Sequence, residues 1–277
     1  MESQNSGTSA TNYINTMFEN SAVENAVDIV GTHTYADPNH NANWNALKEA
    51  ANGKPVWVTE SANLNSTDLS MTDAADYIKW ILRGFNEGGV TAYMLHLFYE
   101  QADNDGYSSL VSWTPTGDII LPKRYYSFKH FTNLVKRGYS LITSNSTDEN
   151  GVYVGSFISD DESKVIVQIF NEGNEKDFSI DIPIGATTVE TFLTTNNDSE
   201  DFSSLGINEI DYYNRYFTTT LPELSLTSLV FDIDESLSNG EFNFVNNNEF
   251  QVELFPNPAE NQLNLIFPDY SNYNIQI

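Results

Sequence analysis

The length, composition and charge of the chain exclude several classes of protein. Its 277 residues include 40% hydrophobic and 13% aromatic side chains, enough for a sizeable packed core, so the acidity does not indicate disorder. The formal net charge of -27 repels nucleic acid and anionic membrane surfaces but not a neutral sugar, and the absence of cysteine excludes disulfides and thiolate chemistry.

Residues 1–138 alternate segments typical of helices with segments typical of strands. Helical spacing of apolar residues predicts helices over 10–18, 44–51, 70–86 and about 124–136. Short apolar runs predict strands over 26–31, 56–59 and 90–95. Short buried strands that alternate with helices indicate a parallel sheet or barrel.

A polar, chemically capable residue follows each of these strands. His33 comes after the first strand, Glu60 after the second and His96 after the third. In parallel sheets and barrels, catalytic side chains collect just past the carboxyl ends of the strands. We therefore expect these three residues at a functional site.

The pattern changes at Tyr139. Apolar and polar residues alternate with period two over 151–158, 164–170, 177–182 and 225–231, and Asp, Asn, Gly and Ser cluster between these runs. This pattern predicts a β-sandwich over 139–235. Residues 236–248 have the composition of a polar linker, and 249–277 begin a further β-rich unit.

Four segments, taken in order, resemble a known family: "DIVGTHTYADP", "GKPVWVTES", "TAYMLHLFYE" and "PKRYYSFKHFTNLVKRGYSLI". Together they resemble the C-terminal part of a glycoside hydrolase of family 30, over about residues 1–235. The resemblance implies an α/β plus all-β fold. Residues 1–138 would supply about strands 5–8 of a (β/α)8 TIM barrel, the C-terminal half, and 139–235 a β-sandwich side domain.

The resemblance also implies roles for individual residues. The family's nucleophile is a Glu at the end of strand 7, typically in a Trp-x-Thr-Glu context, and Glu60 matches it. His33 and Tyr35 match the end of strand 6, which lines the sugar subsites, and His96 and Tyr99 near strand 8 are assigned to substrate binding as well. A nucleophilic carboxylate must stay ionised, and nearby donors such as His33 and Tyr35 favour that state.

One of the two expected catalytic carboxyl groups, the acid/base, has no match in this sequence. Retaining hydrolysis uses two carboxyl groups about 5 Å apart. The family's acid/base Glu follows strand 4, usually as Asn-Glu, and no Asn-Glu of this chain follows a strand that matches. Where the family often carries Trp on strand 8, this chain has Leu95-His96. We expect a retaining hydrolase of a β-linked polysaccharide such as xylan, present as a fragment whose acid/base lies outside this chain. The isolated fragment is therefore expected to be inactive. The alternative is a non-catalytic remnant or carbohydrate-binding fragment.

The C-terminal segment "VELFPNPAENQLNLIF" resembles the start of a type IX secretion sorting tail. That resemblance implies the secretion machinery as a partner and a secreted or cell-surface parent protein. The segment "MESQNSGTSATNY" lacks the basic and apolar regions of a signal peptide, so we expect the signal peptide upstream of Met1. Since no apolar run approaches about 20 residues, no membrane insertion is predicted.

The remaining candidate residues have simpler interpretations. The four His lack the spacing of metal ligands, so neither a metal nor a cofactor is predicted. Trp57 and Trp80 are expected in the core. Trp44 and Trp113 are candidates for sugar platforms.

Overall fold

In the computed structural model, the described residues are 8–35, 43–63, 68–101, 109–142, 151–210 and 216–234, with two short strands at 253–255 and 264–266. The linker predicted over 236–248 lies outside the described residues, as does most of the sorting tail. Of that tail, β15 (Glu253–Phe255) pairs antiparallel with β16 (Asn264–Ile266).

The N-terminal region is built on a three-stranded parallel sheet. Its strands are β1 (Val30–Tyr35), β2 (Val56–Ala62) and β3 (Val90–Tyr93), in the order β1-β2-β3. Both pairs are parallel, which confirms the predicted parallel sheet. Closure of this sheet into a barrel stays a prediction.

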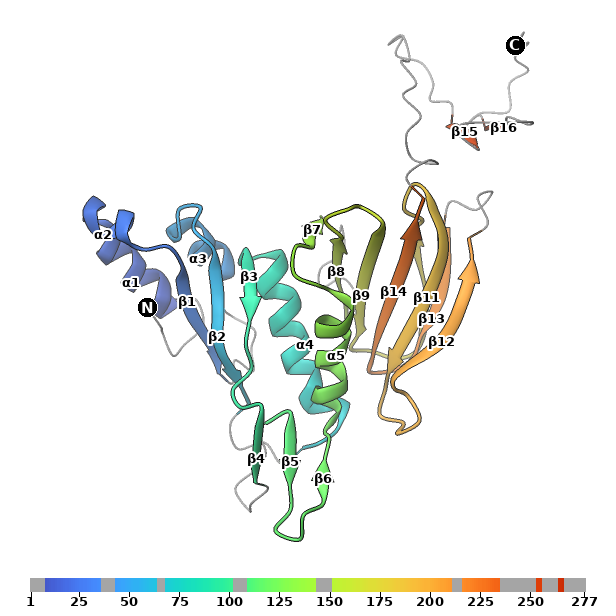
Figure 1. Cartoon of the computed structure of the whole chain (residues 1–277), viewed down its shortest axis with the longest axis horizontal. Helices are drawn as coiled ribbons and strands as arrows, with labels where there is room; N and C mark the ends of the chain where they lie inside the picture. The colour runs from blue at the N-terminus through green and yellow to red at the C-terminus, as the bar shows by residue number, and fades with distance from the viewer. Residues whose placement is uncertain are drawn as a thin grey trace.

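Helices precede and connect these strands (Figure 1). They are α1 (Thr8–Phe18), α2 (Ser21–Ala26), α3 (Trp44–Ala50) and α4 (Met71–Asn86). Val30, Val56, Val58 and Val90 of the sheet pack in one cluster with Ala10, Ile14, Trp44 and Leu47 of α1 and α3. This cluster defines the helix-facing side of the sheet.

Trp44 belongs to this cluster, so its assignment as a candidate sugar platform is wrong. The side chain is 2% exposed. It lies against the end of α4, where a Cβ added to Gly88 would stand 2.5 Å from Cε3 of Trp44. The glycine makes room for the indole ring, and Trp44 is a core residue.

Helix α4 is buried on more than the one face that its apolar spacing predicts. Ser70 caps it, accepting from the Thr72 N–H at 3.1 Å, as Ser commonly does at helix N-termini. Its buried residues include the charged Asp73 and Lys79. The cause is a second layer: α4 and α5 (Lys123–Leu134) lie between the parallel sheet and the antiparallel sheet of the C-terminal region (Figure 1).

The C-terminal region is built from antiparallel strands, and their arrangement as a β-sandwich stays a prediction. A six-stranded antiparallel sheet has the order β12-β11-β14-β9-β8-β7. Its members are β7 (Ser140–Ile142), β8 (Val152–Ile158), β9 (Lys164–Asn171), β11 (Ala186–Thr194), β12 (Asp201–Glu209) and β14 (Ser225–Ile233). The hairpin of β10 (Lys176–Asp181) and β13 (Tyr216–Leu221) packs on it through one hydrophobic core.

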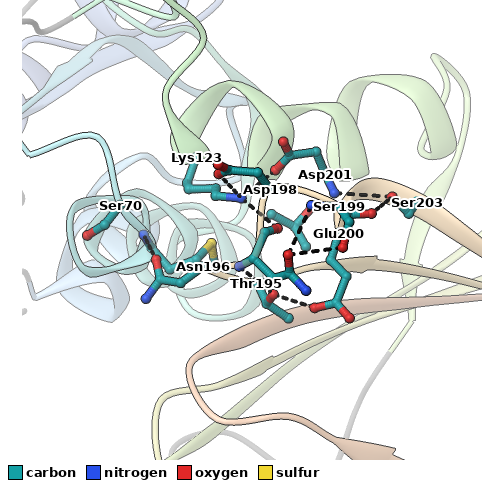
Figure 2. A network of polar contacts seen from close by, with 12 residues as sticks. Ser70, Lys123, Thr195, Asn196, Asp198, Ser199, Glu200, Asp201 and Ser203 are labelled. Carbon is teal, nitrogen blue, oxygen red and sulfur yellow. Dashed lines mark hydrogen bonds and ion pairs between the residues drawn. The ribbon is translucent and has the colours of Figure 1, made fainter.

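The turn between β11 and β12 joins the six-stranded sheet to the helical layer (Figure 2). Asn196 Oδ1 accepts from the Met71 N–H at 2.8 Å, satisfying a free donor at the start of α4. Lys123 at the start of α5 donates to the Asn197 carbonyl at 2.9 Å and to Asp201 at 2.6 Å. The two regions therefore share polar contacts as well as a core.

A small third sheet follows β3. It contains β4 (Tyr99–Gln101), β5 (Val111–Trp113) and β6 (Ile119–Ile120), and Figure 1 shows it beyond the carboxyl ends of β1 and β2. Among the residues that the structure describes, no helix is both long and apolar enough to cross a membrane.

Candidate active site

A β-bulge in β2 decides where Glu60 points. Val58 pairs with Thr32, but Glu60 pairs with the next residue of β1, His33, so Thr59 has no partner position. The Thr59 hydroxyl donates to the Thr32 carbonyl at 3.3 Å across this irregularity. A bulge of this kind inserts one extra residue and locally re-aims the side chains that follow it.

The bulge moves Glu60 away from the helices. Val56 and Val58 face the helices, and strict alternation would place Glu60 on that same apolar side. With Thr59 as the extra residue, Glu60 instead shares the opposite side with its pairing partner His33. An ionised carboxylate is thereby kept out of the apolar layer, where its burial would be costly.

Glu60 lies at the centre of a small polar and aromatic group. The Tyr35 hydroxyl donates a hydrogen bond to Glu60 Oε2. His33 Nδ1 stands 3.7 Å from the same oxygen. The Glu60 side chain is 33% exposed and that of His33 only 6%, so the carboxylate has one face toward solvent and the other toward the protein. The rings of His33 and Tyr35 meet edge to face, with centroids 5.4 Å apart.

His96 joins this group from the third strand. Its ring centroid is 6.4 Å from that of Tyr35. Its backbone N–H donates to the Ser61 carbonyl at 2.9 Å, which places the segment after β3 beside the end of β2. The peptide bond from His96 to Leu97 is cis. The structure thus brings His33, Tyr35, Glu60 and His96 together, each from a strand or the segment just after it.

Tyr99 occupies a different place. It lies on β4 and is 63% exposed. Its ring packs against that of Trp113, 5.5 Å away, and against that of Phe98, 6.3 Å away. Its described ring contacts therefore lie within the small sheet rather than with the Glu60 group.

Two features of this site were not predicted from the sequence. One is the bulge at Thr59, whose signal is a conflict: Val56, Val58 and Glu60 alternate as if on one face, yet two are apolar and one is charged. The other is Tyr93, whose hydroxyl bonds to Thr34 Oγ1 at 2.8 Å and to Ser61 Oγ at 2.7 Å. No local pattern signals the second feature, because it joins three strands. Within the described ranges, no cluster of three or more His, Asp and Glu has the arrangement of a metal site.

Comparisons with known proteins indicate the class of protein that the chain resembles. The family model described as glycosyl hydrolase catalytic core matches residues 1–117. Glucuronoxylanase XynC of Bacillus subtilis is 27% identical over 154 residues, which is 53% of this chain and 33% of that protein. The chain resembles family 30 glycoside hydrolases. It spans about a third of the length of the curated relatives that it matches.

Solved structures share the fold. A family 30 endoxylanase from Clostridium papyrosolvens matches with a TM-score of 0.64 and 19% identity, over 83% of this chain and 55% of that one. A family 30 subfamily 8 xylanase from Clostridium acetobutylicum matches with a TM-score of 0.58 and 21% identity, over 78% of this chain and 51% of that one. Together with the family model and the curated relative, these matches support a glycoside hydrolase similar to family 30.

Proposed function

We propose that the chain is the nucleophile-bearing part of a retaining glycoside hydrolase that acts on a neutral, β-linked polysaccharide of the xylan type. The observation that carries the proposal is the Tyr35 hydroxyl donating to the partly exposed Glu60 carboxylate. This hydrogen bond holds the carboxylate in one orientation. The exposed face leaves room for a substrate.

In this proposal Glu60 performs the first step of a double displacement. A carboxylate oxygen of Glu60 attacks the anomeric carbon, the bond from that carbon to the leaving oxygen breaks, and a covalent glycosyl ester forms. Tyr35 orients the carboxylate during this attack. His33, 3.7 Å from the same oxygen, lies close enough to line the sugar site together with His96.

Charge supports a neutral substrate. No Lys or Arg occurs in the segments that follow the three strands, residues 36–47, 63–78 and 94–122. A uronate or sulfate group on the substrate would find no cation from these segments. The xylan assignment itself follows the printed names of the relatives, two of which are glucuronoxylanases and two of which are xylanase structures.

The wider architecture is proposed on the same basis. We propose that β1, β2 and β3 are strands of a (β/α)8 barrel over residues 1–138, and that the acid/base carboxyl group belongs to a part of the protein outside residues 1–277. The parent protein would be secreted or presented at the cell surface. The tail over 249–277 would engage the secretion machinery.

An activated substrate tests the nucleophile without the acid/base. A 2,4-dinitrophenyl β-xylobioside has a leaving group that departs as a stable phenolate, so its departure requires no proton donor. We expect a burst of dinitrophenolate from the chain, and mass spectrometry should find one xylobiosyl group on the peptide that contains Glu60. Added azide should attack the ester and raise the turnover.

The matched control is Glu60→Gln, which keeps the shape of the side chain and removes its charge. It should show neither burst nor adduct. A folded wild-type chain that gives no adduct, or an adduct that persists in Glu60→Gln, contradicts the proposal.

The alternative, a carbohydrate-binding fragment, is favoured by the exposed aromatic side chains of the small sheet. Phe98 and Tyr99 are 64% and 63% exposed, and the Tyr99 ring packs on that of Trp113. Exposed aromatic rings can stack on sugar rings. Binding of xylo-oligosaccharides that is lost in Tyr99→Ala and kept in Glu60→Gln, with no burst in the wild type, would establish this alternative.

A further inference from the structure

The hydroxyl of Tyr93 lies directly behind the Glu60 site. It bonds to Thr34 Oγ1 at 2.8 Å and to Ser61 Oγ at 2.7 Å, and so joins side chains from all three parallel strands. Thr34 is 1% exposed and Ser61 is fully buried. Burial raises the pKa of Tyr93 well above its ordinary value, so the hydroxyl keeps its proton and can donate to one partner while accepting from the other.

The two partners of Tyr93 are the immediate neighbours of the site residues. Thr34 stands between His33 and Tyr35 on β1, and Ser61 follows Glu60 on β2. Thr34 and Ser61 are also paired with each other in the shifted register that follows the bulge at Thr59. Because successive side chains alternate, the face that carries Thr34 and Ser61 is opposite the face that carries His33, Tyr35 and Glu60.

The two hydrogen bonds of the Tyr93 hydroxyl depend on the register of β1 against β2. A slip by one residue would turn either Thr34 or Ser61 to the other face and leave buried hydroxyl groups without partners. The same slip would separate the Tyr35 hydroxyl from the Glu60 carboxylate. The bond from Tyr35 to Glu60 and the two bonds of Tyr93 therefore require the same register.

We propose that Tyr93 is a positioning residue for the Glu60 site: its hydroxyl holds β1 and β2 in the register that the Thr59 bulge creates, and so keeps the Tyr35 hydroxyl on the Glu60 carboxylate. The catalytic consequence of this arrangement rests on the proposed function. The positioning itself does not.

The test reads the Tyr35–Glu60 contact directly. In the protein that contains the full chain, tyrosines labelled with carbon-13 at Cζ report hydrogen bonding of their hydroxyl groups, and Tyr35→Phe assigns the Tyr35 signal. Glu60→Ala defines where that signal lies when the contact is broken. We expect Tyr93→Phe to move the Tyr35 signal most of the way toward that position. Ser61→Ala and Thr34→Val, which each remove one partner of Tyr93, should move it part of the way.

Tyr77→Phe is the matched control. Tyr77 is also a buried tyrosine of this layer, 1% exposed, but its hydroxyl accepts from the Asn63 backbone N–H, at 2.7 Å, and bonds to no strand side chain among the described residues. It should lower stability by a similar amount and leave the Tyr35 signal in place. An unmoved Tyr35 signal in Tyr93→Phe overturns the proposal, as does an equal movement in Tyr77→Phe. If Tyr93→Phe does not fold, Ser61→Ala and Thr34→Val decide by the same criterion.

Kinetics separate this proposal from the proposed function. If the chain forms the xylobiosyl adduct, Tyr93→Phe should slow adduct formation by about 10- to 100-fold without a matching change in substrate affinity, because a small misplacement of reacting groups has that effect on the chemical step. If no adduct forms in the wild type, the proposed function fails, while the Tyr35 signal still decides whether Tyr93 positions the carboxylate.

Discussion

The Glu60 site and the helical layer both bury polar side chains, but they do so differently. In the helical layer, His130 of α5 is fully buried and both of its ring nitrogens have hydrogen-bond partners within the protein. At the end of the parallel sheet, the Glu60 side chain is 33% exposed, and among the described residues its carboxylate accepts a hydrogen bond from Tyr35 alone. A closed polar cluster is typical of structural joints, whereas an open one has capacity left for a ligand.

The hydrogen bonds around His130 specify one neutral tautomer. The Phe202 N–H donates to Thr194 Oγ1, and this hydroxyl still has its own proton to donate to His130 Nε2, 2.9 Å away. On the other side, Ser228 Oγ donates to Gln168 Oε1, so it accepts from His130 Nδ1 at 2.5 Å. Burial lowers the pKa of His130 to about 3. Among these described neighbours, no group is left to bind a substrate.

The largest effect on stability is expected from a change that disrupts the open site around Glu60. Deletion of Thr59 removes the extra residue, so strict alternation would place the Glu60 carboxylate on the apolar, helix-facing side. Burial of an unpaired carboxylate costs several kcal/mol, so we expect loss of cooperative unfolding in a thermal melt. Thr59→Val keeps the chain length and should stay folded. A deletion variant that unfolds at the wild-type temperature would contradict the role of the bulge.

Breaking a closed cluster should lower the free energy of unfolding by about 3–5 kcal/mol. Arg124 is fully buried and paired with Asp73, and its Nε donates to the Ser109 carbonyl at 2.9 Å. Asp73→Ala leaves the guanidinium without its counter-charge. Urea unfolding measures the loss.

The control for Asp73→Ala is the more exposed pair of Arg83 and Glu87, 2.9 Å apart on α4. Glu87→Gln should cost less than about 1 kcal/mol, because solvent screens such a pair. Equal losses in the two variants would show that closure of the cluster has no energetic effect.

The pH dependence of stability tests the closed cluster at His130. Between its ordinary pKa of 6.5 and the folded value of about 3, the unfolded state binds a proton that the folded state does not. Stability should therefore fall as the pH drops through this window, by up to about 1.4 kcal/mol for each pH unit from this group. Urea unfolding of wild type and His130→Gln from pH 7 to pH 4 isolates the contribution. Parallel curves for the two proteins would exclude it.

The smallest expected effect on stability belongs to the open site. Tyr35→Phe removes one hydrogen bond to a carboxylate that water can still reach, so the free energy of unfolding should change by less than about 1.5 kcal/mol. The same variant should slow formation of the xylobiosyl adduct. A large loss of stability with unchanged adduct formation would make the contact structural.

Much of the fold follows from local patterns. The sequence predicts β2 and β9 from their apolar runs. It predicts α4 from the spacing of Ala74, Ile78 and Leu82. Strand β12 was not predicted, because most of its residues are exposed and lack an alternating apolar face. The hairpin partner β13 was missed too.

The observed ends of two strands also differ from the predicted ones. β2 was expected to end before Glu60 but continues to Ala62, and β3 was expected to reach residue 95 but ends at Tyr93. Both changes come from pairing between strands. The parallel partner of each residue determines how far a strand continues, and that partner lies far away in the sequence.

The sequence by itself determined that polar residues follow three buried strands, that Glu60 stands among them, and that a β-rich region follows. These properties depend on residue type and spacing along one segment. The tertiary structure decided that Glu60 faces away from the helices, that Tyr93 stands behind it, that Trp44 is core and that Tyr99 lies apart on a small sheet. Those outcomes depend on strand register and on what covers each face, and both arise from contacts between distant segments.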